Sequence, residues 1–378
     1  MSDDKDEKVI GESEQENFRS VDRESRAGDP LLKDMLGSSN DSGVNPRTCM
    51  QRWFGTMQPE SVRGSMLALS ATAIGGGVLS LPYVCRLCGL ILGFGMLLLG
   101  FFATVWSFSL MISSDVRKNA ELRGEGKDKK TGIRSIKEFC LQCVGPKMLK
   151  AYELIAIFYL YGSLVGYQII ISNLIQGALK AMGVEEEVAR NYRLYHIIGV
   201  SILTYPLCLL RSVNSLRYAT FVSIGAIAYT AIILVIQVPF FWGTPMQGDL
   251  ELFKLDWNFF NAFGITFFAF TCQAGFYAAL DKLEKRDEVH MKKVAYRSCF
   301  INLTFYSIIA LAGYLSSRSL TPDIIIYRTP PKGFGPFVNI AQFLIAGGLC
   351  IGIPLNYVPL RTAVHNQLFE NPEYTLPR

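Results

Sequence analysis

Glycines and a proline interrupt one apolar stretch of the sequence, and the backbone groups there are the first candidates for chemistry. In SATAIGGGVLSLPYV (residues 70–84), Gly75, Gly76 and Gly77 precede Pro82 where a membrane helix should be continuous. Each Gly costs a helix about 1 kcal/mol relative to Ala, and an interior Pro costs about 3 kcal/mol. An unwound segment leaves free amides at one half-helix and free carbonyls at the other. Such amides attract a carboxylate, and such carbonyls attract an ammonium group or a metal cation.

A second interruption lies in FFAFTCQAGFYAAL (residues 267–280), where small and polar residues from Thr271 to Gly275 break an aromatic-rich helix. Paired interruptions in two halves of a chain indicate a transporter's binding site. A zwitterionic amino acid carries both charges on one carbon, so it matches free amides and free carbonyls that lie close together. Glycine also lets membrane helices pack closely, and we interpret Gly162 and Gly166 in that way. A Gly triplet followed by Pro, paired with a second polar break, favours binding.

Long uncharged runs must position these two interruptions. The stretches 88–112, 154–179 and 257–280 contain no Asp, Glu, Lys or Arg, and about 20 apolar residues cross the hydrocarbon core as a helix. The sequence therefore predicts an all-α polytopic membrane protein with a transmembrane domain over residues 64–358. We expect eight spans, near residues 64–85, 89–113, 152–178, 194–210, 218–242, 257–280, 298–316 and 337–358.

Basic residues between the spans predict the orientation of the chain. The loops after the second, fourth and sixth spans hold ten, two and six Lys and Arg, whereas the other loops hold one, three, one and three. The positive-inside rule then places the N-terminus and the C-terminal end, residues 359–378, in the cytosol. Residues 1–63 hold 13 acidic and 9 basic residues with almost no apolar clusters, which predicts a disordered cytosolic tail. The formal net charge of +5 reflects this topology and does not indicate a nucleic-acid partner.

Several stretches together resemble the amino acid/auxin permease family, whose members include vacuolar and sodium-coupled neutral amino acid transporters. The resemblance implies a leucine-transporter-like fold, with spans one to five and six to ten as inverted repeats. It also implies alternating access to a site between broken spans one and six, with contributions from spans three and eight. The stretches are AIGGGVLSLPYV (73–84), YLYGSLVGYQIIISNLI (159–175), YPLCLLRSVNSLRYATFVS (205–223), FAFTCQAGFYAALDKLEKRDEVHMKKVAYRS (268–298) and PLNYVPLR (354–361).

The same resemblance implies roles for particular residues of the site. One group would meet the carboxylate of an amino acid substrate, a second would line the pocket for its side chain, and a tyrosine of span three would close the site. The carboxylate group comprises Thr72, Gly75, Gly76 and Gly77, the pocket group comprises Phe270, Thr271 and Gln273, and the tyrosine is Tyr161 or Tyr167.

Departures from the family pattern bear on length and on the coupling ion. Family members carry further spans after a Pro-Leu-Arg motif, so we expect this chain to be truncated after span eight. Sodium-coupled relatives carry an Asn before the glycines and a hydroxyl in span eight, where this chain has Ala71, Cys350 and Gly352. Because a hard cation such as sodium prefers oxygen ligands, proton coupling or facilitated exchange is expected over sodium coupling. Asp281 and Glu284 are the nearest proton carriers, although solvated charges at a helix end explain them better.

Other functional classes fit the residues less well. An intramembrane enzyme needs catalytic acids, a His cluster or a Ser/Lys pair facing a cavity, and the spans lack such sets, so we expect no enzyme, cofactor or metal. The CxxC pairs at Cys85 and Cys140 lie on opposite predicted sides and cannot share a zinc ion. A neutral substrate is favoured because a buried cationic side chain would need an acidic partner. The alternative is an amino-acid-sensing receptor without net transport. Plasma and vacuolar or lysosomal membranes are both compatible locations.

Overall fold

The protein is described by a computed structural model over residues 62–124, 135–181, 192–209, 217–280, 283 and 286–368. Every regular element in these ranges is an α-, 3₁₀- or π-helix. The predicted tail over residues 1–63 lies outside the described residues apart from its last two, as do Asp281 and Glu284. The structure therefore bears on the predicted transmembrane domain and leaves these predictions as they stand.

In the described part of the chain, five helices are long and apolar enough to cross a membrane. Four of them, at 30 to 36 residues, are longer than the ~20 residues that a span needs, and the fifth has 25. A sixth candidate span is bent by 57° at a short break, and it consists of α4 (Val62–Ala73), the 3₁₀ turn η1 (Gly76–Ser80) and α5 (Leu81–Cys88). The long helices are α6 (Leu90–Gly124), α8 (Pro146–Ala181), α11 (Arg217–Phe241), α14 (Glu288–Ser317) and α15 (Gly335–Leu368).

Two of the eight expected spans differ from a simple membrane helix. The fourth is α10 (Arg193–Cys208), whose 16 residues give a helix of about 24 Å, shorter than the hydrocarbon core of about 30 Å. The sixth is divided into α12 (Asn258–Phe270), a 3₁₀ turn η5 (Gln273–Gly275) and α13 (Phe276–Leu280). A helix thus occupies each expected position, and the second break lies where the polar interruption predicted it.

Several helices continue past the predicted span ends. The predicted C-terminal end of the domain at residue 358 is one such case, since α15 continues to Leu368. Charged residues mark where a helix leaves the apolar layer, but they do not end it, because pairs three or four residues apart support exposed helical turns. Near the end of α6, Lys118 Nζ forms an ion pair with Glu121 Oε2 at 3.0 Å. In the first turn of α14, Lys292 Nζ forms one with Glu288 Oε1 at 2.6 Å.

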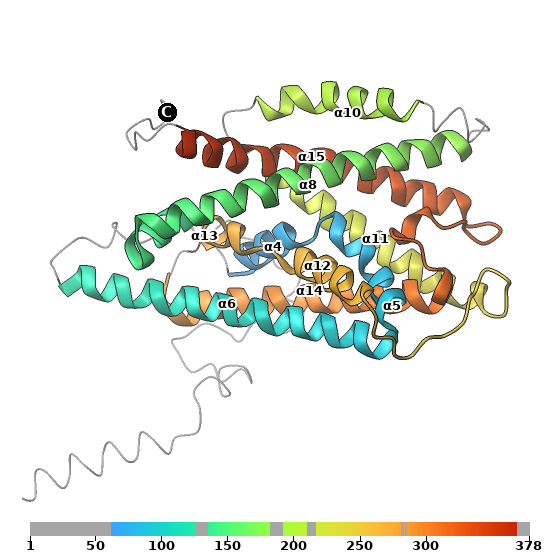
Figure 1. Ribbon diagram of the computed structural model, residues 1–378, viewed down its shortest axis with the longest axis horizontal. Coiled ribbons are helices and arrows are strands. Elements are labelled where there is room, and N and C mark those ends of the chain that lie inside the picture. Colours follow the sequence, from blue (N-terminus) through green and yellow to red (C-terminus); the bar gives the residue numbers. More distant parts are fainter. Residues whose placement is uncertain are drawn as a thin grey trace, which may run out of the picture. The chain divides into compact units, whose positions relative to one another are not determined.

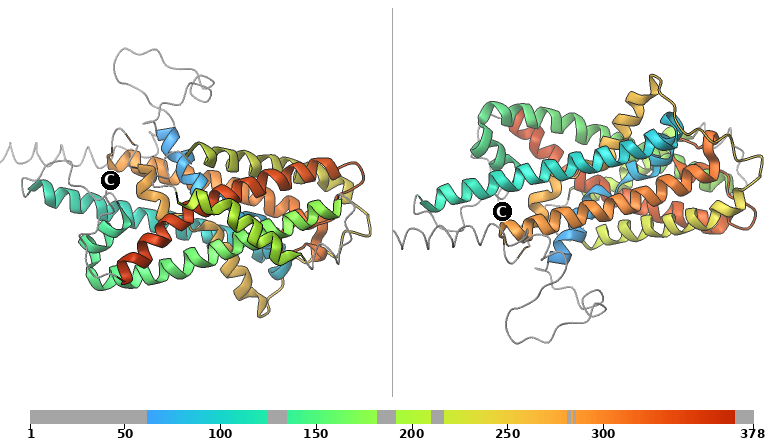
Figure 2. Two further views of the ribbon diagram at one scale, coloured as in Figure 1. Left: turned by 90° about the horizontal axis from the view of Figure 1, so that it is seen from above. Right: turned by 90° about the horizontal axis from the view of Figure 1, so that it is seen from below.

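The broken segments lie in the middle of the helical bundle. Figure 1 shows α4, α5, α12 and α13 between the long helices α8 and α15 on one side and α6 and α14 on the other, and Figure 2 shows the same bundle from above and below. The two broken spans are antiparallel neighbours, since α12 packs on α5 whereas α13 packs on α4. This arrangement brings the two breaks together inside the protein, away from the lipid-facing surface.

Candidate functional site

The first break exposes backbone amides at the Gly triplet. Helix α4 ends at Ala73, and Gly75 takes an extended conformation with φ −132° and ψ −161°. The carbonyl of Gly75 accepts from the amide of Val78 at 3.3 Å, but the amides of the three glycines donate to no backbone carbonyl of the described chain. These amides are the first donors of the following half-helix, which is the end that attracts an anion.

Close packing explains why glycine occupies all three positions. A Cβ on Gly75 would lie 2.9 Å from the Tyr167 hydroxyl oxygen, and one on Gly76 would lie 2.8 Å from the Ile170 Cδ1 atom. A Cβ on Gly77 would lie 2.9 Å from a ring carbon of a phenylalanine on α12. The first two glycines thus approach α8, and the third approaches the other broken span.

Hydroxyl groups satisfy the carbonyls at the second break. Thr271 is extended, with φ −76° and ψ 103°, so α12 ends with free carbonyl oxygens. Thr104 of α6 donates to the carbonyl of Phe270 at 3.4 Å, and Tyr159 of α8 donates to that of Thr271 at 3.5 Å. The Gln273 side-chain oxygen accepts from the next free amide, that of residue 272, at 3.0 Å. Neighbouring helices therefore supply what a broken span in a membrane requires.

Tyr306 of α14 connects the two breaks. Its hydroxyl oxygen lies 2.8 Å from the carbonyl oxygens of both Ala73 and Ala269, and its side chain is fully buried. Ala73 is the last residue of α4, and Ala269 is in the last turn of α12. Both carbonyls therefore belong to the negative ends of half-helix dipoles. A single phenol hydrogen is shared between them.

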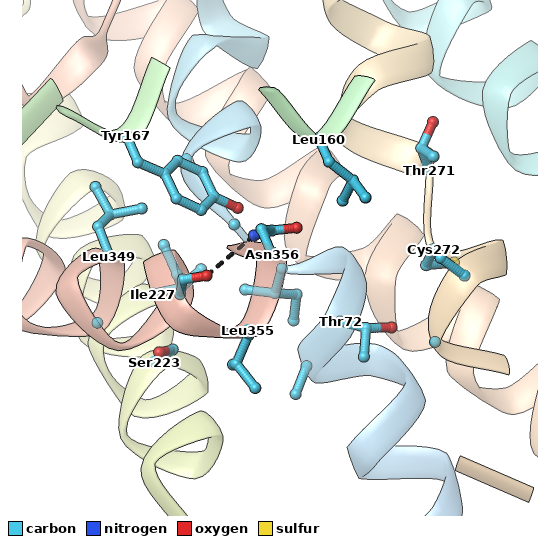
Figure 3. A pocket seen from close by; sticks show the side chains of 18 of the residues that line it. Thr72, Leu160, Tyr167, Ser223, Ile227, Thr271, Cys272, Leu349, Leu355 and Asn356 are labelled. Carbon is cyan, nitrogen blue, oxygen red and sulfur yellow. Dashed lines mark hydrogen bonds between the residues drawn. The ribbon is translucent and has the colours of Figure 1, made fainter. Parts of the chain in front are cut away.

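A cavity of about 420 Å³ opens beside the two breaks, within the usual range of about 300–1,000 Å³ for small-molecule sites. Figure 3 shows Tyr167 of α8 pointing toward Asn356 of α15, with Thr72 and Thr271 on the broken spans. The Asn356 amide donates to the carbonyl of Gly352 at 3.1 Å and also interacts with the Tyr167 hydroxyl. Five spans thus contribute to the wall.

Five of the nine predicted site residues line this cavity, and the others do not. The lining residues among them are Thr72, Gly75, Gly76, Tyr167 and Thr271.

The remaining four have identifiable reasons to lie elsewhere. Tyr161 is 62% exposed, because it is two residues from Tyr159 and therefore about 200° around the helix from it. The Phe270 ring packs edge-on against Tyr306, with centroids 4.9 Å apart. Gln273 caps the second break, and Gly77 faces α12.

Sequence reasoning did not predict a contribution from span five, and it named no residue of span eight for the site. Ser223 of α11 and Asn356 of α15 are polar residues in apolar runs, which is the signal that could have identified them. Tyr159 also lines the cavity, although the resemblance implied a role only for the other two tyrosines of span three. Tyr306 gave no pattern, since a single tyrosine in an apolar helix does not reveal which carbonyls it reaches.

The cavity wall is largely apolar, with a few polar side chains and no charged ones. Its polar side chains are hydroxyl, amide and thiol groups, and no Asp, Glu, Lys, Arg or His of the described residues lines it. In the same part of the chain, no three His, Cys, Asp or Glu side chains gather as a metal site. Backbone amides are consequently the anion-binding groups that this site offers.

Known proteins similar to this chain are amino acid transporters by name. "Putative amino acid transporter AAT1" of Plasmodium berghei is 24% identical over 346 residues, covering 89% of this chain and 53% of the relative. "Vacuolar amino acid transporter 7" of Saccharomyces cerevisiae is 25% identical over 314 residues, covering 81% and 59%. "Amino acid transporter AVT6E" of Arabidopsis thaliana is 23% identical over 329 residues, covering 83% and 64%. The matched region thus spans between about half and less than two thirds of each relative's length.

The family comparison covers most of the chain. The sequence model described as "Transmembrane amino acid transporter protein" matches residues 58–376, which include both broken spans and every helix that lines the cavity. The chain therefore belongs to the transmembrane amino acid transporter protein family.

Proposed function

We propose that this integral membrane protein carries neutral amino acids across a membrane by alternating access, with the substrate bound in the cavity between the two broken spans. The observation that carries the proposal is the pair of free amides, at Gly75 and Gly76, in the cavity wall. Backbone amides at the start of a half-helix bind a carboxylate without any charged side chain. Family membership indicates a transporter rather than an enzyme.

The substrate's side chain would extend toward α8, α11 and α15. In this assignment Thr72 and Thr271 flank the charged end of the amino acid, and Tyr167 covers it from α8. Gly77, Phe270 and Gln273 support the breaks from behind the wall. Tyr161 has no role in the assignment, because its side chain faces away from the cavity.

The uncharged wall supports a neutral substrate. A cationic or anionic side chain in a dry pocket would need an opposite charge, since burying an unpaired charge is costly. No charged side chain of the described residues meets this need. An apolar or small polar side chain would instead contact residues such as Ile227, Leu349 and Leu355.

The position of the Tyr306 hydroxyl, where the two breaks meet, supports a mechanism in which no sodium ion binds there. Carbonyls at the ends of half-helices are where transporters of this kind hold a cation. Here the phenol hydrogen of Tyr306 already lies between the carbonyls of Ala73 and Ala269. We therefore favour proton coupling or facilitated exchange, in a vacuolar, lysosomal or plasma membrane with the N-terminus in the cytosol.

Uptake into liposomes tests this function. The chain would be reconstituted and given a mixture of labelled neutral amino acids under an inward proton gradient, an inward sodium gradient, or neither. We expect accumulation with the proton gradient, or exchange without any gradient. Specific binding without uptake would favour the amino-acid-sensing alternative, and the absence of both binding and uptake would contradict the proposal.

A further inference from the structure

One carboxyl group of the helical bundle is buried without a hydrogen-bond partner. Asp115, near the end of α6, is 1% exposed. Neither of its carboxylate oxygens has a hydrogen-bond partner of good geometry in the described part of the chain. An ionised carboxylate in this position lacks solvent and well-aligned donors, which disfavours the charged form.

The groups that face Asp115 come from three other segments. Arg286, just before α14, acts on it with the opposite charge, and the Asn119 side chain, one turn along its own helix, is a nearby donor whose geometry falls short of a regular hydrogen bond. Asp115 also interacts electrostatically with Tyr277 of α13 and with Cys143 in the π-helical turn η3 (Cys140–Val144). Tyr277 is 2% exposed, and its hydroxyl likewise has no hydrogen-bond partner among the described residues. Two unsatisfied oxygen groups therefore lie in one buried region.

This region is directly connected to the cavity. Gly275 lines the cavity, and α13 begins at the next residue, so Tyr277 follows the second break by only two positions. The two aromatic residues of α13 anchor this short helix. The ring centroids of Phe276 and Phe108 of α6 are 4.9 Å apart, and those of Tyr277 and Phe139 are 6.2 Å apart. A movement of the second break would therefore change the surroundings of Asp115.

A second buried carboxyl group provides a contrast. Glu153 of α8 is 6% exposed, but one of its oxygens accepts a hydrogen bond of 2.8 Å from the Asn366 side chain of α15. Glu153 thus has a donor in the folded state, as a structural carboxylate does. Asp115 has the opposite requirement, since a proton would convert it into a neutral group that can donate to an unsatisfied neighbour such as Tyr277.

We propose that Asp115 is a proton-binding site that couples the position of α13 to the proton gradient. A water-borne proton forms an O–H bond with a carboxylate oxygen when α13 packs on α6, and it returns to water when α13 moves away and hydrates the group. This inference rests on the proposed transport function, which supplies the movement. Among the described residues, Arg286 is the cation that would hold the deprotonated form.

Infrared spectroscopy tests proton binding without requiring transport. The purified full chain in lipid would be titrated through acidic to alkaline pH while the carbonyl stretch of protonated carboxylic acids is followed. We expect a titrating band that is lost in Asp115→Asn and retained in Glu153→Gln. If Asp115→Asn fails to fold, Asp115→Glu should move the band instead. A band unchanged in either Asp115 variant, or no titrating band in the unmodified chain, would overturn the proposal.

Flux measurements test the coupling. In liposomes, Asp115→Asn should keep exchange of labelled for unlabelled amino acid but lose accumulation driven by a proton gradient, whereas Glu153→Gln should keep both. Accumulation by Asp115→Asn at the level of the unmodified chain would overturn the coupling. Failure of exchange in the unmodified chain would count against the transport function itself, and the infrared result would still decide whether Asp115 binds the proton.

Discussion

At the scale of single residues, the three glycines of the first break have different surroundings. Gly75 and Gly76 face the cavity and α8, whereas Gly77 faces Phe268 of α12. The identical residue type therefore serves two purposes, which are exposure of amides and close approach of two backbones. Their substitution should accordingly affect binding more than membrane insertion.

The Gly76→Leu variant tests the proposed carboxylate contact. A Cβ alone would lie 2.8 Å from the Ile170 Cδ1 atom and 3.6 Å from Leu349, so a larger side chain must enter the cavity. Because that side chain would occupy space that the substrate needs, we expect a loss of substrate affinity of about tenfold or more, equivalent to about 1.4 kcal/mol. Equilibrium binding to purified protein measures it. Gly162→Leu is the matched control, since nothing lies within 4 Å of a Cβ there. Equal affinity in both variants would contradict the assignment.

Tyr306→Phe tests whether one hydroxyl holds the two breaks in place. Its loss leaves the carbonyls of Ala73 and Ala269 without their donor, at a cost of about 1–3 kcal/mol. We expect lower thermal stability together with an affinity loss of about tenfold or more, because the breaks shape the cavity. Both quantities can be measured on the purified protein.

Tyr314→Phe is the control for that variant. Tyr314 is also on α14 and fully buried, and its hydroxyl donates to the carbonyl of Glu251 at 2.9 Å, remote from the cavity. The Tyr314→Phe variant should have lower thermal stability and unchanged substrate affinity. An affinity loss of the same size in both variants would mean that Tyr306 acts only through general stability.

At the scale of elements, the contact between the two broken spans depends on another glycine. A Cβ on Gly275 would lie 2.6 Å from the Thr72 Cγ2 atom, so η5 and α4 touch without space for a methyl group. This contact brings the first residues of α13 against α4 and fixes the distance between the breaks. Disrupting this contact tests how the two broken spans are arranged, rather than the role of a single substrate-binding group.

Gly275→Ala should separate the two breaks. We expect a destabilisation of about 1–3 kcal/mol from overpacking and a slower exchange of labelled amino acid in liposomes. Gly264→Ala on α12 is the matched control: its Cβ would meet nothing within 4 Å, and Ala favours the helix by about 1 kcal/mol. Chemical denaturation and exchange rates are the measurements. Unchanged values for Gly275→Ala would show that the breaks tolerate separation.

The predictable elements were those whose signal is local. Charge-free runs located the long helices, and the Gly triplet and the polar patch at Thr271 located both breaks, because helix-breaking residues act where they occur. The helical turns of α6 and α15 beyond the predicted spans were not anticipated, since exposed turns lack an apolar run. The role of Tyr306 and the unpaired state of Asp115 depend on contacts between distant segments. Such contacts exist only once the helices pack.

At the scale of the whole molecule, the two ends of α6 define the two sides of the bundle. The amide of Leu90 donates to the carbonyl of Glu251 at 3.0 Å, which ties the first turn of α6 to the loop after α11. Cys143 of η3 lies close enough to Lys118 to feel its charge. Residues 90 and 118 are about 42 Å apart along the helix. Cys143 and the loop after α11 therefore lie on opposite sides of any membrane that α6 crosses.

Labelling of Cys143 with a membrane-impermeant maleimide tests the predicted orientation. Cys143 is exposed, yet partial burial raises the pKa of its thiol. Because the thiolate is the reactive form, a raised pKa leaves little of it at neutral pH. The labelling rate should therefore rise as the pH increases toward that pKa. In a background with Cys49→Ser and Cys140→Ser, we expect labelling only from the cytosolic side at mildly alkaline pH, and Cys143→Ser should remove it. With Cys143→Ser also present, Met246→Cys, in the loop after α11 and 46% exposed, should label only from the other side. The reverse pattern would invert the orientation inferred from the basic loops, while leaving the fold and the cavity unchanged.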